Sequence, residues 1–289
     1  MAQSALSARL KAVSVSRHVH DLLQIPHSGT VLATFDRSCY LDLDGHVVAL
    51  VLPELLDGPL NLLVQATGDF QFYDLPVGET VENSSAGILI GNAVELTVQQ
   101  ASIWEPQLAR WGRSYLSSVR ANLNFLKEIL LGETPEGSFA TYRTDPAGLS
   151  VRARSGMNLL EEGLMHRSPV STGEAAQHLA GLGSGLTPSG DDVLVGALIC
   201  LSVLPHEPSE LRTAIITRVR GRTTRISEAY LMAAARGEAG EAWHRLLRVL
   251  PNGDRAAIAS ATRRVMAFGE TSGSDMLAGF TLAVSTLIS

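Results

Sequence analysis

The sequence predicts an α+β fold in which a small antiparallel β-domain, either a barrel or a sandwich, precedes an all-α domain. Short β-rich runs separated by turn residues fill the stretch from Thr30 to about Val98. From Thr172 onward, every long segment has apolar residues at helical spacing instead. The predicted parts are residues 1–105 for an N-terminal helix and the β-rich domain, 106–171 for a long helix and a Gly/Pro-rich connection, and 172–289 for the helical domain.

In the front part, apolar residues between Ala5 and Val15 predict an amphipathic helix that ends before Pro26. Asp44-Gly45 indicates a hairpin, because a type I′ turn needs positive φ and glycine adopts it easily, and Gly91-Asn92 indicates a similar turn. The predicted strands are Thr30 to Phe35, Ser38 to Asp42, His46 to Leu52, Leu60 to Gln65, Gly87 to Ile90 and Ala93 to Val98.

Behind Pro106, apolar spacing predicts one long helix from Leu108 that stops at Gly132. Two later helices, Val193 to Leu204 and Met276 to Ile288, are apolar on nearly all sides, so we expect them at the centre of the helical domain with their N-terminal ends meeting there or at a cleft. The predicted helices are Gly173 to Leu182, Asp191 to Leu204, Ser209 to Arg220, Arg225 to Arg236, Glu238 to Leu250, Ala256 to Phe268 and Ser274 to Ile288.

Composition narrows the classes of protein. With 289 residues, 45% of them hydrophobic, the chain can bury a large core. Its formal charge of −6 argues against a coat for nucleic acid or an anionic membrane. Cys39 and Cys200 lie far apart, so they are expected to be buried reduced thiols rather than metal ligands. No apolar stretch resembles a signal peptide or a membrane span, so a cytoplasmic location is expected.

The segment Gly181-Leu-Gly-Ser-Gly-Leu-Thr-Pro-Ser-Gly-Asp-Asp192 leads directly into one of the two apolar helices. A Gly-rich loop before a helix exposes backbone N–H groups at the positive end of the helix dipole, which suits an anionic or polar ligand. Ser189 or Asp191 is expected to cap the helix, and the simpler alternative is a capped helix start with no ligand. The segment is neither a Walker loop nor a dinucleotide fingerprint.

An internal sequence repeat favours a ligand-binding role for this segment over a capped helix start with no ligand. Ser189-Gly-Asp-Asp-Val-Leu-Val-Gly196 aligns with Ser272-Gly-Ser-Asp-Met-Leu-Ala-Gly279, which brings Asp192 opposite Asp275. In each copy the glycine lies four residues after the aspartate, on the same helical face, so a second helix or a ligand can approach there. Buried carboxylates need a partner, a ligand or a metal.

A third motif begins another helix at Thr224. Thr224, Ser227 and Tyr230 fall near one face, and Arg222 or Arg225 is placed to neutralise an anion. The alternative is a Thr-capped helix with a half-buried tyrosine and surface arginines. No histidine pair, nucleophile elbow or Cys-His pairing is present, so no catalytic residue is assigned. The candidate binding residues are Gly183, Gly185, Leu186, Thr187, Ser189, Gly190, Asp191, Asp192, Thr224, Arg225, Ser227, Tyr230, Thr271, Ser272, Gly273 and Asp275.

These three motifs together, at 181–192, 224–231 and 269–280, resemble the AllH-like family. The likeness is specific over about residues 175–285 and vague over the β-rich front. It implies a subunit of oxamate carbamoyltransferase, in which three different chains interconvert oxalurate plus phosphate and oxamate plus carbamoyl phosphate during allantoin breakdown. It also marks Pro188 and Gly279 as signature positions, without giving any residue a chemical role.

Three functional hypotheses therefore remain open. The first is a carbamoyltransferase subunit that binds an anionic small molecule and has partner subunits. The second is metal-assisted hydrolysis as in ADP-ribosylglycohydrolases, with Mg²⁺ on Asp191, Asp192 and Asp275. The third is a non-catalytic scaffold. No cofactor is firmly implied, and neither nucleic acid nor membrane is expected as a partner.

Overall fold

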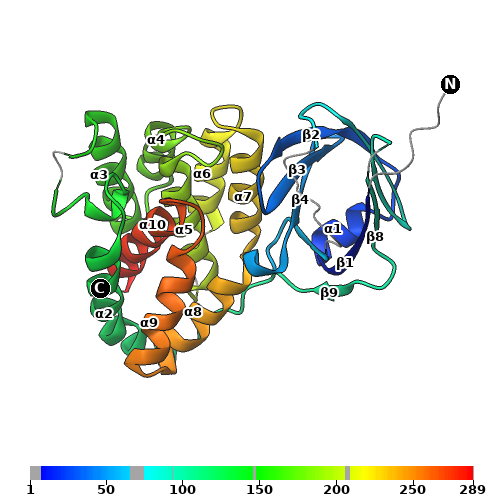
Figure 1. Cartoon of the computed structure of the whole chain (residues 1–289). Coiled ribbons are helices and arrows are strands. Elements are labelled where there is room, and N and C mark those ends of the chain that lie inside the picture. The colour runs from blue at the N-terminus through cyan, green and yellow to red at the C-terminus, as the bar shows by residue number, and fades with distance from the viewer. Residues whose placement is uncertain (1–7, 66–74, 93, 146–147, 206–208, 289) are drawn as a thin grey trace. The chain divides into compact units, whose positions relative to one another are not determined.

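The computed structural model describes residues 8–65, 75–92, 94–145, 148–205 and 209–288. The chain divides into two compact units, residues 1–106 and 107–289 (Figure 1). The first is a β-barrel and the second is all helical, so the α+β prediction is confirmed.

Eight strands close the barrel in the order β5-β4-β3-β2-β6-β7-β8-β1, because β1 also pairs with β5. A ninth strand extends the pairing along β1. Most pairs are antiparallel, as predicted, but β4 with β5, β1 with β8 and β1 with β9 are parallel. The strands are β1 (Ala8–Ser16), β2 (Ser28–Thr34), β3 (Ser38–Leu43), β4 (His46–Val51), β5 (Asn61–Gln65), β6 (Thr80–Ser84), β7 (Gly87–Ile90), β8 (Val94–Thr97) and β9 (Ser102–Trp104).

The predicted N-terminal helix is wrong within the described residues, since the segment from Ala8 to Ser16 is strand β1. Its buried Leu10 and Ala12 alternate with exposed neighbours, which is the two-residue period of a strand. A short helix, α1 (Arg17–Leu22), follows it. The predicted positions Ala5 and Leu6 lie outside the described residues.

The other front elements match the prediction more closely. Five predicted strands correspond to β2, β3, β4, β5 and β7, and the sixth to β8, with Ala93 outside the described residues. At the β3–β4 turn, Asp44 has φ 48° and Gly45 has φ 93°, as a type I′ turn requires. Strands β6 and β9 were not predicted. Cys39 is buried in the barrel core and Cys200 in the helical core, and neither forms a disulfide.

The helical unit is built around α5 and α10, with the other helices of that unit around them in Figure 1. Every residue of α5 after Ser189 is buried, which confirms its predicted central position. The helices are α2 (Leu116–Glu133), α3 (Val151–Met165), α4 (Pro169–Leu179), α5 (Ser189–Val203), α6 (Ser209–Val219), α7 (Arg225–Arg236), α8 (Glu241–Asn252), α9 (Arg255–Met266) and α10 (Ser272–Leu287).

Two details of this unit differ from the prediction. Helix α2 begins after a 3-10 turn, η3 (Arg113–Tyr115), and not at Leu108. Helix α3 lies where a Gly/Pro-rich connection was expected. Its glycines allow α4 to approach, since a Cβ added at Gly163 would lie 2.6 Å from the backbone nitrogen of Thr172. Within the described part of the chain, no helix is both long and apolar enough to cross a membrane.

Candidate functional site

Helices α5 and α10 cross at the two glycines that end the repeated motif. A Cβ added at Gly196 would lie 1.8 Å from the carbonyl oxygen of Met276, and one added at Gly279 would lie 1.9 Å from that of Val193. Val193 and Met276 are aligned positions of the two motif copies, so the contact is reciprocal. The close approach predicted from the glycine spacing is therefore confirmed, and the second helix makes it.

The same reciprocity joins the serines and aspartates at the N-terminal ends of these helices. Ser272 hydrogen-bonds to the Asp192 carboxyl, and Ser189 hydrogen-bonds to the Asp275 carboxyl. The serine hydroxyl of each motif copy thus donates a hydrogen bond to the aspartate of the other copy. Asp275 Oδ1 also accepts bonds of 2.7 Å from Ser138 Oγ and from the backbone N–H of Phe139.

Both aspartates are buried, with 4% of Asp192 and none of Asp275 exposed. Burial raises the pKa of Asp192 well above its usual value, and repulsion from the Asp275 and Asp191 charges raises it further. Burial likewise raises the pKa of Asp275 despite its hydrogen-bond donors. The Oδ2 atom of each has no hydrogen-bond partner, and neither does the nearby Ser274 hydroxyl. The pair therefore favours a retained proton, and it keeps unused hydrogen-bonding capacity.

Asp191 has a different role from Asp192. Its Oδ1 accepts a 3.0 Å bond from the Gly181 backbone N–H. Its Oδ2 accepts from the Thr223 hydroxyl and, at 3.0 Å, from Ser227 Oγ. Because both oxygens have protein donors, Asp191 ties the Gly-rich loop to the start of α7.

The Gly-rich loop that precedes α5 is exposed to solvent. Gly183 and Gly185 have φ values of 128° and 88°, and residues 183–186 are exposed. The half-buried Thr187 places its hydroxyl 3.1 Å from Ser272 Oγ, while Thr224 Oγ1 donates to the Leu186 carbonyl at 2.5 Å. A line of hydroxyls therefore runs from Thr187 through Ser272 to Asp192.

The remaining predicted residues shape the site or lie beside it. Gly190 and Gly273 allow α4 and α9 to approach closely, since an added Cβ would lie 2.2 Å from the Leu179 carbonyl oxygen and 2.0 Å from that of Val265. Thr271 hydrogen-bonds to Asp275. The Tyr230 ring packs edge-on against Phe268, with 6.1 Å between centroids.

Arg225 is exposed at the first turn of α7. The hydrogen bonds that reach Asp192 and Asp275 come from Ser138, Phe139, Ser189, Thr271 and Ser272.

The expected cap of α5, Ser189 or Asp191, is wrong, because its N-cap is Pro188. The N-cap of α10 is Thr271, and neither of these residues provides a side-chain cap bond. The aspartates turn inward because hydroxyl donors from other elements reach them there. Thr224 does cap α7, accepting from the Ser227 N–H.

Sequence reasoning missed Ser138, Phe139 and Thr223. Ser138 and Phe139 lie 137 and 136 residues before Asp275, the aspartate that they contact. They belong to a short turn in which the motif is not repeated. Only the Thr223-Thr224 pair next to a recognised motif offered a signal.

The three aspartates do not form a metal site of the expected kind. Within the described ranges, no group of three or more His, Cys, Asp or Glu side chains is arranged to hold a metal ion. Asp191 faces its own donors, which leaves only two carboxylates at the helix ends.

Comparison with known families gives two matches. Residues 179–284 match the family described as oxamate carbamoyltransferase subunit AllH, and residues 11–103 match the AllH family N-terminal domain. The second match covers the β-rich front, over which the resemblance in the sequence was vague. No solved structure matches the chain.

Proposed function

The chain belongs to the AllH family, and on that premise we propose that it works as a subunit of an oxamate carbamoyltransferase that binds a small anionic substrate at its Gly-rich loop. A subunit of this kind implies partner subunits, which would complete the enzyme. The proposed binding surface is the exposed stretch 183–186 with the half-buried Thr187, together with the start of α7.

The line of hydroxyls from Thr187 through Ser272 to Asp192 carries this proposal. It connects a half-buried loop hydroxyl to a buried carboxyl whose pKa is raised, so a proton can pass between the buried pair and a ligand on the loop. The loop adds backbone N–H groups next to the N-terminus of α5, which favours negative charge.

This arrangement fits transfer of a carbamoyl group between nitrogen and phosphate. In the family's reaction a phosphate oxygen bonds to the carbamoyl carbon of oxalurate, the bond from that carbon to the oxamate nitrogen breaks, and the nitrogen gains a proton. We assign Thr187 to deliver that proton, with Ser272 and Asp192 behind it as positioning residues. The phosphate proton returns along the same line.

The test is ligand binding by the purified chain and by two variants. Carbamoyl phosphate, oxalurate, oxamate and phosphate are each added at about a hundred times Kd, where a specific ligand stabilises a fold by about 2.7 kcal/mol. We expect at least one of them to raise the melting temperature of the natural chain and to have little effect on Asp192→Asn or Asp275→Asn. Asp254→Asn is the matched control, because Asp254 is an exposed helix cap.

Two outcomes would contradict the proposal. An equal response in all variants would remove the aspartate pair from the site. A response to ADP-ribose that needs Mg²⁺ and disappears with a chelator would favour the hydrolase instead. If the chain alone shows no response, the same variants are compared in activity assays of the complex with its partner subunits, where Asp192→Asn is expected to lose at least tenfold in rate and Asp254→Asn none.

A further inference from the structure

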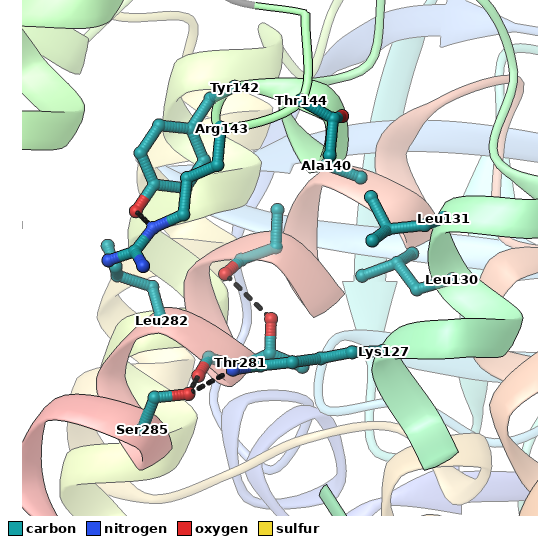
Figure 2. Close-up of a pocket in the computed structure, with 11 residues that line it drawn as sticks. Lys127, Leu130, Leu131, Ala140, Tyr142, Arg143, Thr144, Thr281, Leu282 and Ser285 are labelled. Atoms are coloured by element: carbon teal, nitrogen blue, oxygen red, sulfur yellow. Dashed lines mark hydrogen bonds between the residues drawn. The ribbon is translucent and has the colours of Figure 1, made fainter. Parts of the chain in front are cut away.

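A separate pocket of about 110 Å³ lies between α2, the turn after η4 (Phe139–Thr141) and the middle of α10. Most of its wall is apolar, with Leu130 and Leu131 from α2 and Leu282 from α10 (Figure 2). None of the candidate binding residues at the Gly-rich loop lines it. It is therefore distinct from the proposed substrate site.

The polar part of this pocket is dominated by Lys127. Figure 2 shows Lys127 extending from α2 towards Ser285 on α10, where its ammonium donates a 2.6 Å hydrogen bond to the Ser285 hydroxyl. The Ser285 hydroxyl in turn donates to the Thr281 carbonyl at 2.5 Å. The side chain of Lys127 is thus held in place at the wall of the pocket.

Among the residues that the structure describes, no carboxylate lies within 4.0 Å of this ammonium, although the negative charge of Glu161 acts on it from farther away. Burial lowers the pKa of Lys127, and the positive charge of Arg143 lowers it further, while the negative charge of Glu161 partly opposes the shift. Arg143 has its own partner, since its guanidinium pairs with Glu161 and its Nε donates to the Tyr142 hydroxyl at 2.5 Å. Lys127 and Arg143 together carry two positive charges against the one carboxylate of Glu161, so the pocket presents a net positive charge beside leucine side chains.

We propose that this pocket binds a small organic monoanion, with its carboxylate on Lys127 and a short aliphatic part against Leu130, Leu131 and Leu282. A half-buried cation gains most from an anion that replaces its lost water, and apolar walls favour a hydrocarbon tail over a bare inorganic ion. At about 30 Å³ per water, the volume corresponds to about four waters, or an organic acid of about four to six non-hydrogen atoms.

An occupant here would contact the turn that orients the aspartate pair. Ala140, Tyr142 and Arg143 line the pocket, while the preceding Ser138 and Phe139 bind Asp275. The pocket and the proposed substrate site are therefore connected through a single short segment.

The composition of the chain offers a direct test. Lys11 and Lys127 are its only lysines, and Lys11 is exposed on strand β1 of the other unit. Reductive methylation with ¹³C labels both and keeps their charge, so NMR reports on each separately. Butyrate is the probe, and butyramide is its uncharged match in shape. We expect butyrate to shift the Lys127 signal saturably with a Kd of about 1 mM, leaving Lys11 unchanged, and butyramide to shift neither.

Calorimetry on the unlabelled chain and on two variants measures how much each lysine contributes to butyrate binding. Lys127→Met should weaken butyrate binding at least tenfold, while Lys11→Met should leave it unchanged, and an unaltered melting temperature shows that Lys127→Met is folded. The proposal is overturned if butyramide binds as well as butyrate, if Lys127→Met binds normally, or if no saturation occurs by about 50 mM, far above the expected Kd. If inorganic phosphate binds at Lys127 and butyrate does not, the proposal that the pocket selects an organic anion is overturned. None of these results depends on the Gly-rich loop.

Discussion

Asp192 and Asp275 lower the stability of the folded chain at neutral pH, because burial penalises the charged form of both and repulsion from Asp275 adds to the penalty at Asp192. Each also keeps an oxygen without a hydrogen-bond partner in the interior. Residues that serve only the fold would not need two carboxylates there. Their retention at the ends of two apolar helices agrees with a role in binding or proton transfer.

We expect Asp192→Asn to stabilise the isolated chain at pH 7 by about 1–3 kcal/mol, the usual cost of an unsatisfied buried polar group. The folded-state pKa of Asp192 is raised, so its stabilising, protonated form is fully present below the unfolded pKa of about 4 and is lost as pH rises through the folded value. The gain should therefore shrink as pH falls to about 4. Urea unfolding at both pH values measures it, and a loss of stability at pH 7 would contradict the assignment.

Asp191 is expected to behave in the opposite way. Its carboxylate accepts three hydrogen bonds that link Gly181, Thr223 and Ser227. Asp191→Ala leaves these donors unsatisfied, so we expect a loss of about 2–4 kcal/mol in the free energy of unfolding. Comparing the urea midpoints of Asp191→Ala and Asp192→Asn distinguishes the structural role of Asp191 from the role of Asp192 in the buried aspartate pair. Equal shifts in the same direction would contradict this distinction.

At the residue scale, the sequence repeat was enough to find Asp192 and Asp275 but not their surroundings. The repeat aligned the two aspartates because both copies retain the same spacing. Ser138 could not be found in this way, because its contact with Asp275 depends on how a distant turn packs against α10. Local capping rules also misassigned Ser189 and Asp191, since tertiary donors took their place.

Among the elements, strongly apolar or strongly alternating segments were predictable and mixed ones were not. Helices α5 and α10 are apolar on all sides, so only a central position satisfies them. The apolar residues of strand β1 fit both periods, since Leu10 and Val13 have helical spacing while Leu10 and Ala12 alternate, and the pairing with distant β5 and β8 decides the matter. Helix α3 was obscured by glycines that serve its packing on α4.

The crossing of α5 and α10 leads to a prediction about non-additivity. Gly196→Ala and Gly279→Ala each place a methyl group within 2 Å of a carbonyl oxygen, so each should destabilise the chain by about 1–3 kcal/mol or more. Once one substitution has separated the helices, the second adds less, so the double variant should cost clearly less than the sum.

Gly132→Ala is the control for this series, because Gly132 lies in α2 with open space around it. Alanine there should stabilise the helix by up to about 1 kcal/mol. Denaturant unfolding of the four variants gives all the values. Additive losses would mean that the two glycines do not share one contact.

For the whole molecule, the two units have separate hydrophobic cores. The barrel core is formed by residues between Leu10 and Leu96, and the helical core by residues between Leu108 and Val284. A core of its own is the usual condition for a unit to fold independently. The fold class followed from the sequence because the hydrophobic period changes between these two units, whereas barrel closure depends on the pairing of β1 with β5.

We therefore expect residues 107–289 to fold when produced alone, with a helical circular dichroism spectrum and a cooperative melting transition. All the proposed substrate-loop residues lie in this fragment, so ligand-induced stabilisation seen in the full chain should persist. A fragment that is helical but melts without cooperativity would show that the barrel is needed for packing.

The exchanged serines and aspartates of α5 and α10 have a consequence for how such a site arises. Contacts in which position i of one half meets position j of the other, and j meets i, are those of a symmetric homodimer interface. A chain with one such helix would complete its site only by associating with a second copy of itself. Two such helices in one chain make the contact permanent and let each copy diverge. The aligned pair Asp191 and Ser274 illustrates this divergence, since one anchors the loop and the other does not.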